Sequence, residues 1–236
     1  MSISSKGYKP TSVFQIGPNL YLNACVGLNG GPYNTFDYSV GYFKAAEKLV
    51  DQVRFESSDI DLLIYPIIYL YRHGIELGIK SLVKLLPPLW GVSINVEPTH
   101  RLHDNWNNIK PYLMKNRDFD PEDVLIQGVE DILNELTRVD PSGEVFRFHY
   151  KRSEVRHTEL DELRVINIDV FAEAVEYVRS AIYHWHSVIN AIKLKRPQPK
   201  MPVVITMELK MNVVQRVIYL AKELYNLEYL NSISLA

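Results

Sequence analysis

The sequence has little cysteine and no excess of positive charge. Cys25 is the single cysteine among 236 residues, which excludes a disulfide framework and a zinc site built from cysteines. The 26 Lys and Arg residues are balanced by 28 Asp and Glu residues, whereas a domain that coats nucleic acid through its bulk charge is strongly basic. Contact with an anionic partner therefore requires a local basic patch.

The sequence also has no long run of uncharged hydrophobic residues. Residues 1–10 lack the apolar core of a signal peptide. The most apolar stretch, residues 60–86, contains charged residues such as Arg72 and Glu76, and each charge near the centre of a membrane helix costs about 2.5–3.5 kcal/mol. We therefore expect a cytoplasmic protein with no membrane segment.

Patterns for phosphate-binding loops and metal sites are missing as well. The glycine-rich segment 27–32 lacks the spacing and the lysine of a phosphate-binding loop, and is more typical of a turn. His100, His103 and Asp104 are spaced like metal ligands, but no second cluster completes the set. We therefore predict neither a metal ion nor a cofactor.

The composition that remains is that of a folded domain. Hydrophobic residues make up 47% of the chain and charged residues 23%, which excludes a disordered chain. There are 15 Tyr residues against 8 Phe residues. Because tyrosine joins an apolar ring to a polar hydroxyl, this excess suits surfaces and interfaces that are half-buried.

Apolar residues at helical spacing predict a mostly α-helical protein. Pro87 and Pro88 are expected to end the second helix, and Asp169 is expected to cap the long fifth helix. The predicted helices cover residues 34–55, 57–86, 103–115, 121–139, 169–195 and 213–225.

One segment has a different period. From Val145 to Lys151 successive side chains alternate between two faces, one of them aromatic and the other basic. Residues 163–168 form a second short candidate strand. The fold class we expect is therefore all-α for the most part, a helical bundle with a small β-hairpin at about residues 145–168, before a long helix.

The domain organisation follows from these elements. Residues 1–33 are predicted to form a turn-rich N-terminal arm, and residues 34–195 a helical domain that includes the hairpin. Residues 196–236 are expected to supply a linker and a C-terminal helix that packs on the same domain.

The second predicted helix carries a polar stripe inside an apolar sequence. Tyr69, His73, Glu76 and Lys80 lie on one face, and Arg72 reaches Glu76 at a spacing of four residues. Buried charges must be paired, since an unpaired one costs several kcal/mol. The stripe is therefore either an internal ion pair with a hydrogen-bonded histidine or a ligand site inside a helical bundle.

The predicted strand forms a second cluster of basic residues. Its members Arg147, His149 and Lys151 alternate with aromatic residues, which suits contact with phosphates and stacking on bases. An edge strand protected by charge would show the same pattern. Arg152 and His157 add an R-x4-H spacing, and such a pair suffices for RNA cleavage without a metal, because imidazole takes the 2′-hydroxyl proton and guanidinium stabilises the charge on phosphorus.

An acidic stretch balances these basic residues. Residues 118–135 contain seven Asp or Glu residues and no Lys or Arg. We expect this stretch to meet a basic protein partner or a second copy of the chain. RNA is the partner expected for the basic strand.

Three segments together resemble a group of bacterial HEPN-like proteins. The first is Tyr65–Lys80, which contains Tyr-Arg-His-x-x-Glu-Leu. The second is Thr99-His-Arg-Leu, which leads to Trp106, and the third is Val139–Phe148, with Asp-x-x-Ser followed by Phe-Arg-Phe. The resemblance spans roughly residues 35–150.

This resemblance implies a helical bundle that forms a homodimer and belongs to a toxin–antitoxin or phage-defence system. Many members of the family are metal-independent ribonucleases with an R-x4-6-H motif near the dimer interface. The positions that match the group's motifs are Arg72, His73, Glu76, His100, Asp140 and Arg147.

The sequence is compatible with two functions, an endoribonuclease and a non-catalytic binding module such as a scaffold, antitoxin or sensor. A pocket for a small molecule or nucleotide between tyrosine-lined helices is a third, weaker hypothesis. The candidate catalytic residues are Arg72, His73, Glu76, Arg152 and His157. The candidate ligand-binding residues are Tyr69, Lys80, His100, Arg147, His149 and Lys151.

Overall fold

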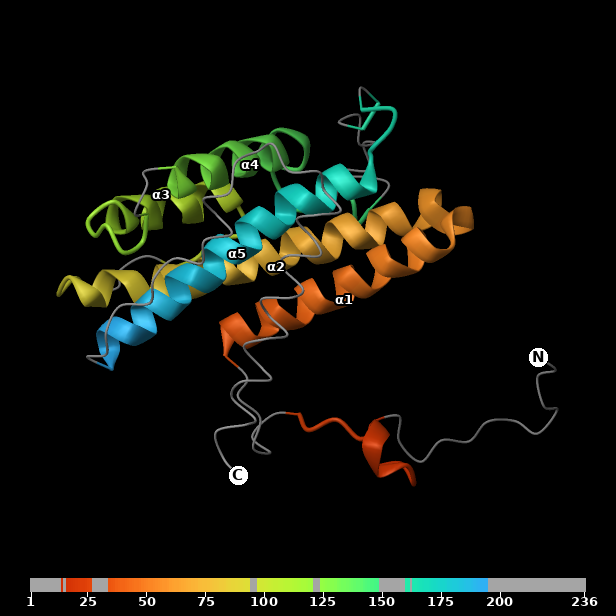
Figure 1. Ribbon diagram of the computed structural model, residues 1–236, viewed down its shortest axis with the longest axis horizontal. Helices are drawn as coiled ribbons and strands as arrows, with labels where there is room; N and C mark the ends of the chain where they lie inside the picture. Colours follow the sequence, from red (N-terminus) through yellow and green to blue (C-terminus); the bar gives the residue numbers. More distant parts are fainter. Residues whose placement is uncertain are drawn as a thin grey trace, which may run out of the picture. The chain divides into compact units, whose positions relative to one another are not determined.

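The structure is a computed structural model, and Figure 1 shows its course. It describes residues 14, 16–26, 34–93, 97–120, 124–148, 160–161 and 163–194. The chain divides into two units, Met1–Asn34 and Thr35–Ala236, and each is described by itself. In the first unit, Leu20–Leu22 forms a short 3-10 turn (η1), and the Asn19 side chain accepts a hydrogen bond from its Tyr21 N–H.

The second unit is built from α-helices. A 3-10 turn, Ser57–Asp59 (η2), joins the first two helices. The described residues contain no strand, so the prediction of an all-α protein is confirmed. The helices are α1 (Thr35–Phe55), α2 (Ile60–Leu89), α3 (Leu102–Leu113), α4 (Leu125–Val139) and α5 (Ile168–Lys193).

Helix α2 is the centre of this unit. It contacts α1, α3 and α5, and α1, α2 and α5 run side by side, while α3 and α4 lie together next to this layer (Figure 1). The apolar faces meet in one main core that holds Phe43, Trp106 and Trp185 with no exposed surface. Burial of these large rings supplies much of the hydrophobic stabilisation.

Glycine allows the central helices to approach closely. A Cβ atom on Gly74 would lie 3.1 Å from the Phe43 ring of α1, and one on Gly78 would lie 2.9 Å from Ile182 of α5. The hydroxyl of Ser39 donates to the carbonyl of Gly74 over 2.6 Å, which joins α1 to α2. The long α2 is therefore fixed on both sides.

Two helix ends differ from the prediction. Helix α2 continues through Pro87 and Pro88 to Leu89. Proline has a helical φ angle, so two prolines can occupy a last turn, at the cost of two backbone hydrogen bonds and of crowding between each ring and the carbonyl four residues earlier. Asn167, not Asp169, caps α5, since its side-chain oxygen accepts from the N–H groups of Asp169 and Val170.

The β-hairpin prediction is wrong for the residues that the structure describes. Residues 145–147 form a turn, and residues 164–167 have no regular structure. The Asp140 carboxylate accepts from the N–H groups of Glu144 and Val145, and the Glu144 carbonyl accepts from Arg147 and Phe148. These bonds close the backbone into a turn and use N–H groups that a strand would need for pairing.

The structure explains part of the acidic stretch by local contacts. Asp120 is buried and caps α4, because its two oxygens accept from the N–H groups of Val124, Leu125 and Ile126. Glu130 accepts from Lys110 over 2.7 Å and from the indole of Trp106 over 3.2 Å. Both acids therefore stabilise the fold.

Candidate functional site

The polar stripe of α2 begins with a buried ion pair. Arg72 Nη1 lies 3.2 Å from Glu76 Oε2, one helical turn further along, and the two side chains are only 4% and 3% exposed. The spacing of four residues places both on the same face of the helix. Because neither group meets solvent, their remaining polar atoms need protein partners.

A loop after α4 supplies the second partner of Arg72. Arg72 Nε lies 3.1 Å from Asp140 Oδ2, and Nη2 donates to the Asp140 carbonyl over 3.3 Å. Gly143, in the same loop, has a φ of +80°, and a Cβ there would lie 2.5 Å from Arg72 Nη1. The loop therefore needs glycine both for its backbone angle and for space.

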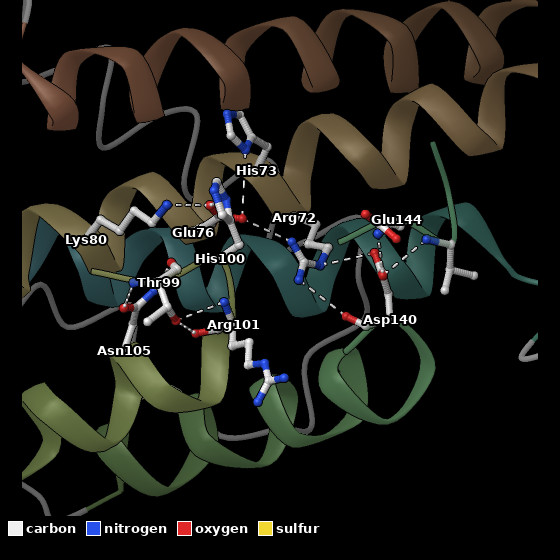
Figure 2. A network of polar contacts seen from close by, with 11 residues as sticks. Arg72, His73, Glu76, Lys80, Thr99, His100, Arg101, Asn105, Asp140 and Glu144 are labelled. Atoms are coloured by element: carbon white, nitrogen blue, oxygen red, sulfur yellow. Dashed lines mark hydrogen bonds and ion pairs between the residues drawn. The ribbon is translucent and has the colours of Figure 1, made fainter. Parts of the chain in front are cut away.

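Glu76 is the centre of the site, as Figure 2 shows. Besides Arg72, its carboxylate accepts from Lys80 Nζ over 2.7 Å. The imidazole of His100 places Nδ1 3.0 Å from Glu76 Oε1, and His73 Nδ1 lies 3.9 Å from Oε2. One buried carboxylate thus joins two histidines, a lysine and an arginine (Figure 2).

These neighbours set the charge of the site. Burial opposes the ionisation of Glu76, but the hydrogen bond from Lys80 and the charges of Lys80 and Arg72 outweigh it and lower its pKa. Burial lowers the pKa of His73, and Lys80 and Arg147 add to this effect, against the opposing charge of Glu76. At neutral pH the site therefore holds an ionised carboxylate beside an uncharged His73 imidazole.

His100 comes from the loop before α3, and Asn105 fixes that loop. The Asn105 side chain is fully buried; its oxygen accepts from the Thr99 N–H over 2.9 Å, and its amide donates to the Thr99 carbonyl over 2.8 Å. The Arg101 N–H donates to Thr99 Oγ1 over 3.1 Å (Figure 2). The backbone on either side of His100 is thereby held over Glu76.

Aromatic rings border the site on one side. The Arg147 guanidinium lies 5.1 Å from the Tyr69 ring and 4.9 Å from the Phe148 ring, and Phe148 is 50% exposed. The His73 ring stacks on Tyr69 at 5.8 Å and meets Tyr42 of α1 edge-on at 4.5 Å. The surface therefore combines flat faces with positive charge.

The structure brings most of the predicted site residues together. They share direct contacts around Glu76 or stack on Tyr69, and they are Tyr69, Arg72, His73, Glu76, Lys80, His100 and Arg147. His149, Lys151, Arg152 and His157 lie outside the described residues, as does the helix predicted over 213–225.

Some residues of the site have no clear signal in the sequence. Asn105 and Tyr42 lie inside helical patterns, where nothing separates them from ordinary packing or surface positions. Gly143 has a better signal, because a glycine in a Pro-Ser-Gly segment often adopts a positive φ. Its contact with Arg72, 71 residues earlier, depends on the tertiary structure.

The described part of the chain contains neither a metal-binding cluster nor a membrane-spanning helix. There, no group of three or more His, Cys, Asp or Glu side chains is arranged to hold a metal ion. Nor does any described helix have the length and apolar character needed to cross a membrane.

No protein-family model, curated protein or solved structure matches this chain. The function is therefore inferred from the geometry around Glu76 and from the motifs of the sequence.

Proposed function

We propose that this chain is a HEPN-like protein of a bacterial toxin–antitoxin or phage-defence system that binds RNA and cleaves it without a metal ion. The all-α fold agrees with the resemblance. Support also comes from the motif positions, since Arg72, His73, Glu76, His100 and Asp140 lie far apart in the sequence and meet in one network.

One observation carries the proposal. Two imidazoles and an ammonium group surround one ionised carboxylate, and the imidazoles are accessible, with His73 25% and His100 83% exposed. Imidazole is the side chain best suited to take a proton near neutral pH. A cationic group next to it stabilises the negative charge that develops on phosphorus during cleavage.

The reaction assigned to this site begins when an imidazole takes the proton of a ribose 2′-hydroxyl. The 2′-oxygen then attacks the adjacent phosphorus, and the bond from phosphorus to the 5′-oxygen breaks. The 5′-oxygen leaves with a proton from solvent, so the products are a 2′,3′-cyclic phosphate and a 5′-hydroxyl.

Lys80 and Arg147 are the cations that we assign to the RNA phosphates. Arg72 is too deeply buried to touch the RNA, and its proposed role is to hold Glu76.

The test is incubation of pure protein with single-stranded RNA in EDTA. We expect degradation that EDTA does not inhibit and that removal of both imidazoles in the double variant His73→Ala/His100→Ala slows, because loss of the proton-transfer group typically costs 10²–10⁴-fold. Intact RNA after incubation would contradict the proposal. The same assay on His157→Ala tests the R-x4-H hypothesis, and cleavage equal to that of the wild type would remove His157 from the site.

A non-catalytic HEPN-like binding or scaffold module is the second candidate. The observation in its favour is the internal pairing of Arg72, which makes two ion pairs and a hydrogen bond inside the protein and has little exposed surface. This function predicts RNA binding without cleavage, and loss of stability in Arg72→Ala. Binding of RNA in a gel-shift assay, with no products after long incubation, would select it.

The partner proposals are a homodimer and a protein that meets the acidic stretch. Among the described acids of that stretch, Asp131 and Glu135 lie exposed on α4, with side-chain hydrogen bonds from Gln127 and Arg138. Sedimentation equilibrium tests the dimer, for which a mass near 27.3 kDa, that of one chain, would be the contrary result.

A further inference from the structure

We propose that Glu76 and His100 form a carboxylate–imidazole dyad, in which Glu76 orients His100 and the exposed Nε2 atom of His100 is the general base of the site. This inference rests on the proposed RNA cleavage and assigns the proton-transfer step to one of the two histidines. It also gives Asn105 a role, as the residue that positions His100.

The contact with Glu76 determines the tautomer of His100. An ionised carboxylate only accepts hydrogen bonds, and the lowered pKa of Glu76 keeps it ionised at neutral pH. His100 Nδ1 lies 3.0 Å from Glu76 Oε1, so Nδ1 carries the hydrogen and donates it. In a neutral imidazole the other nitrogen, Nε2, then has a free lone pair, which is the form that accepts a proton.

The His100 side chain is also accessible to a substrate. His100 is 83% exposed although its partner Glu76 is 3% exposed. The dyad therefore has one end anchored inside the protein and the other end open to a substrate. Other side chains fix the carboxylate as well, since Lys80 shares Oε1 and Arg72 lies on Oε2. Because the carboxylate already holds the imidazole in one orientation, little further entropy is lost when the base meets the substrate.

His73 differs from His100 in its contacts and in its exposure. His73 Nδ1 is 3.9 Å from Glu76, too far for a hydrogen bond, and its ring lies between the rings of Tyr42 and Tyr69. Its side chain is 25% exposed, less than a third of the value for His100. His73 therefore lacks both the fixed orientation and the open approach of His100.

Asn105 is the positioning residue. An asparagine that joins both the N–H and the carbonyl of Thr99 fixes the backbone directly before His100. The side chain of Asn105 has no exposed surface, so its contact with a substrate is excluded. The effect of its replacement on the cleavage step is therefore expected to act through the orientation of His100.

The test combines a spectroscopic measurement with an activity assay on the full chain. ¹⁵N NMR of histidine-labelled protein at pH 8.5, about two units above the ordinary imidazole pKa, reports which ring nitrogen carries the hydrogen. We expect the Nδ1–H form for His100 in the wild type. We expect a shift toward the Nε2–H form in Glu76→Gln and a mixture of forms in Asn105→Ala. A wild-type His100 mainly in the Nε2–H form would overturn the dyad, and since this reading needs no substitution it does not depend on how the variants fold.

The activity assay uses single-stranded RNA in EDTA. His100→Gln is expected to lower kcat at least 100-fold with little change in KM, and Asn105→Ala to lower kcat to a smaller degree. His103→Gln is the matched control, because His103 is also an exposed histidine, three residues further along and on α3, and it is expected to cleave like the wild type. Wild-type kcat in His100→Gln would overturn the general-base role while the proposed function stands. An Nδ1–H tautomer in a protein that cleaves no RNA would instead support the dyad geometry and contradict the proposed function.

Discussion

Gly143 lies so close to the guanidinium of Arg72 that a Cβ atom added to the glycine would stand 2.5 Å from Nη1. The loop that follows α4 is thereby packed directly on the buried charge of α2. Through Arg72 and Glu76 the same network reaches His100 in the loop before α3. Two loops that flank one surface are held by one buried ion pair.

The contact between Gly143 and Arg72 gives a stability prediction with a built-in control. Gly143→Ala is expected to lower the free energy of unfolding by about 2–4 kcal/mol, since it adds backbone strain and displaces a buried charge. Gly91 also has a positive φ, but nothing lies within 4 Å of its Cβ position, so Gly91→Ala is expected to cost only about 1–2 kcal/mol. Urea unfolding of the three proteins measures both values, and equal losses would show that the packing against Arg72 has no weight.

Removal of Arg72 itself is expected to be more damaging. Arg72→Ala leaves Glu76 and Asp140 as buried carboxylates without their shared partner, which costs about 3–5 kcal/mol. Arg138 makes an exposed ion pair with Glu135 on α4, and Arg138→Ala is expected to change stability by at most about 1 kcal/mol. Thermal melting compares the two variants. A melting point of Arg72→Ala equal to that of the wild type would contradict the network as drawn.

His186 predicts a loss of stability in acid. Burial, assisted by the charge of Lys193, lowers the pKa of His186 to about 4, and its Nε2 lies 2.6 Å from Ser81 Oγ. The unfolded chain binds the proton at an ordinary pKa of about 6.5, so the stabilising contribution is complete above pH 6.5 and is lost as the pH falls toward 4. The loss amounts to at most about 3 kcal/mol.

The measurement for His186 is the slope of unfolding free energy against pH between 6.5 and 4. His186→Asn is expected to have a shallower slope than the wild type, whatever its stability at pH 7.5, because one titrating group has been removed. Identical slopes in the two proteins would mean that the pKa of His186 is the same in the folded and unfolded states, which contradicts the prediction.

The aromatic border of the site predicts an effect on RNA binding. Tyr69→Ala and Arg147→Ala are expected to weaken the binding of single-stranded RNA about 5- to 150-fold, as the loss of one stacking face typically costs ~1–3 kcal/mol. Lys115 makes a similar cation–π contact with Trp90 and Tyr112, outside the candidate site, and serves as the control. Fluorescence anisotropy gives the Kd values. A Kd in Lys115→Ala raised as much as in Arg147→Ala would indicate that bulk charge governs binding.

Local sequence patterns predicted well the helices that the structure describes. The first helix was expected over 34–55 and spans Thr35–Phe55, because a long amphipathic period with a polar start leaves few alternatives. The strand predicted from Val145 onward is wrong where the structure describes it, because residues 145–147 lie in a turn closed by the Asp140 carboxylate. The residue types alternate in the sequence, but Val145 and Phe146 are both buried and Arg147 and Phe148 are both exposed, so the pattern did not distinguish a capped turn from a strand.

The candidate site was predictable only along α2. The spacing of Arg72, Glu76 and Lys80 fixes their contacts within one helix, whatever the rest of the chain does. The contacts of Asp140 and His100 with that helix depend on how the loops fold back, 68 and 24 residues away in the sequence. The two hydrogen bonds between the Asn105 side chain and the Thr99 backbone were not predictable, since an asparagine in a helix can have many other partners.

The most direct test of the central claim is the cleavage of one defined RNA oligonucleotide in EDTA, compared with the same oligonucleotide carrying a 2′-deoxy sugar at the cleaved position. The proposed mechanism predicts that the unmodified strand is cut to a 2′,3′-cyclic phosphate and a 5′-hydroxyl, and that the deoxy strand stays intact. Cleavage of both strands, or of neither, would contradict an imidazole that activates the 2′-hydroxyl at the Glu76–His100 site.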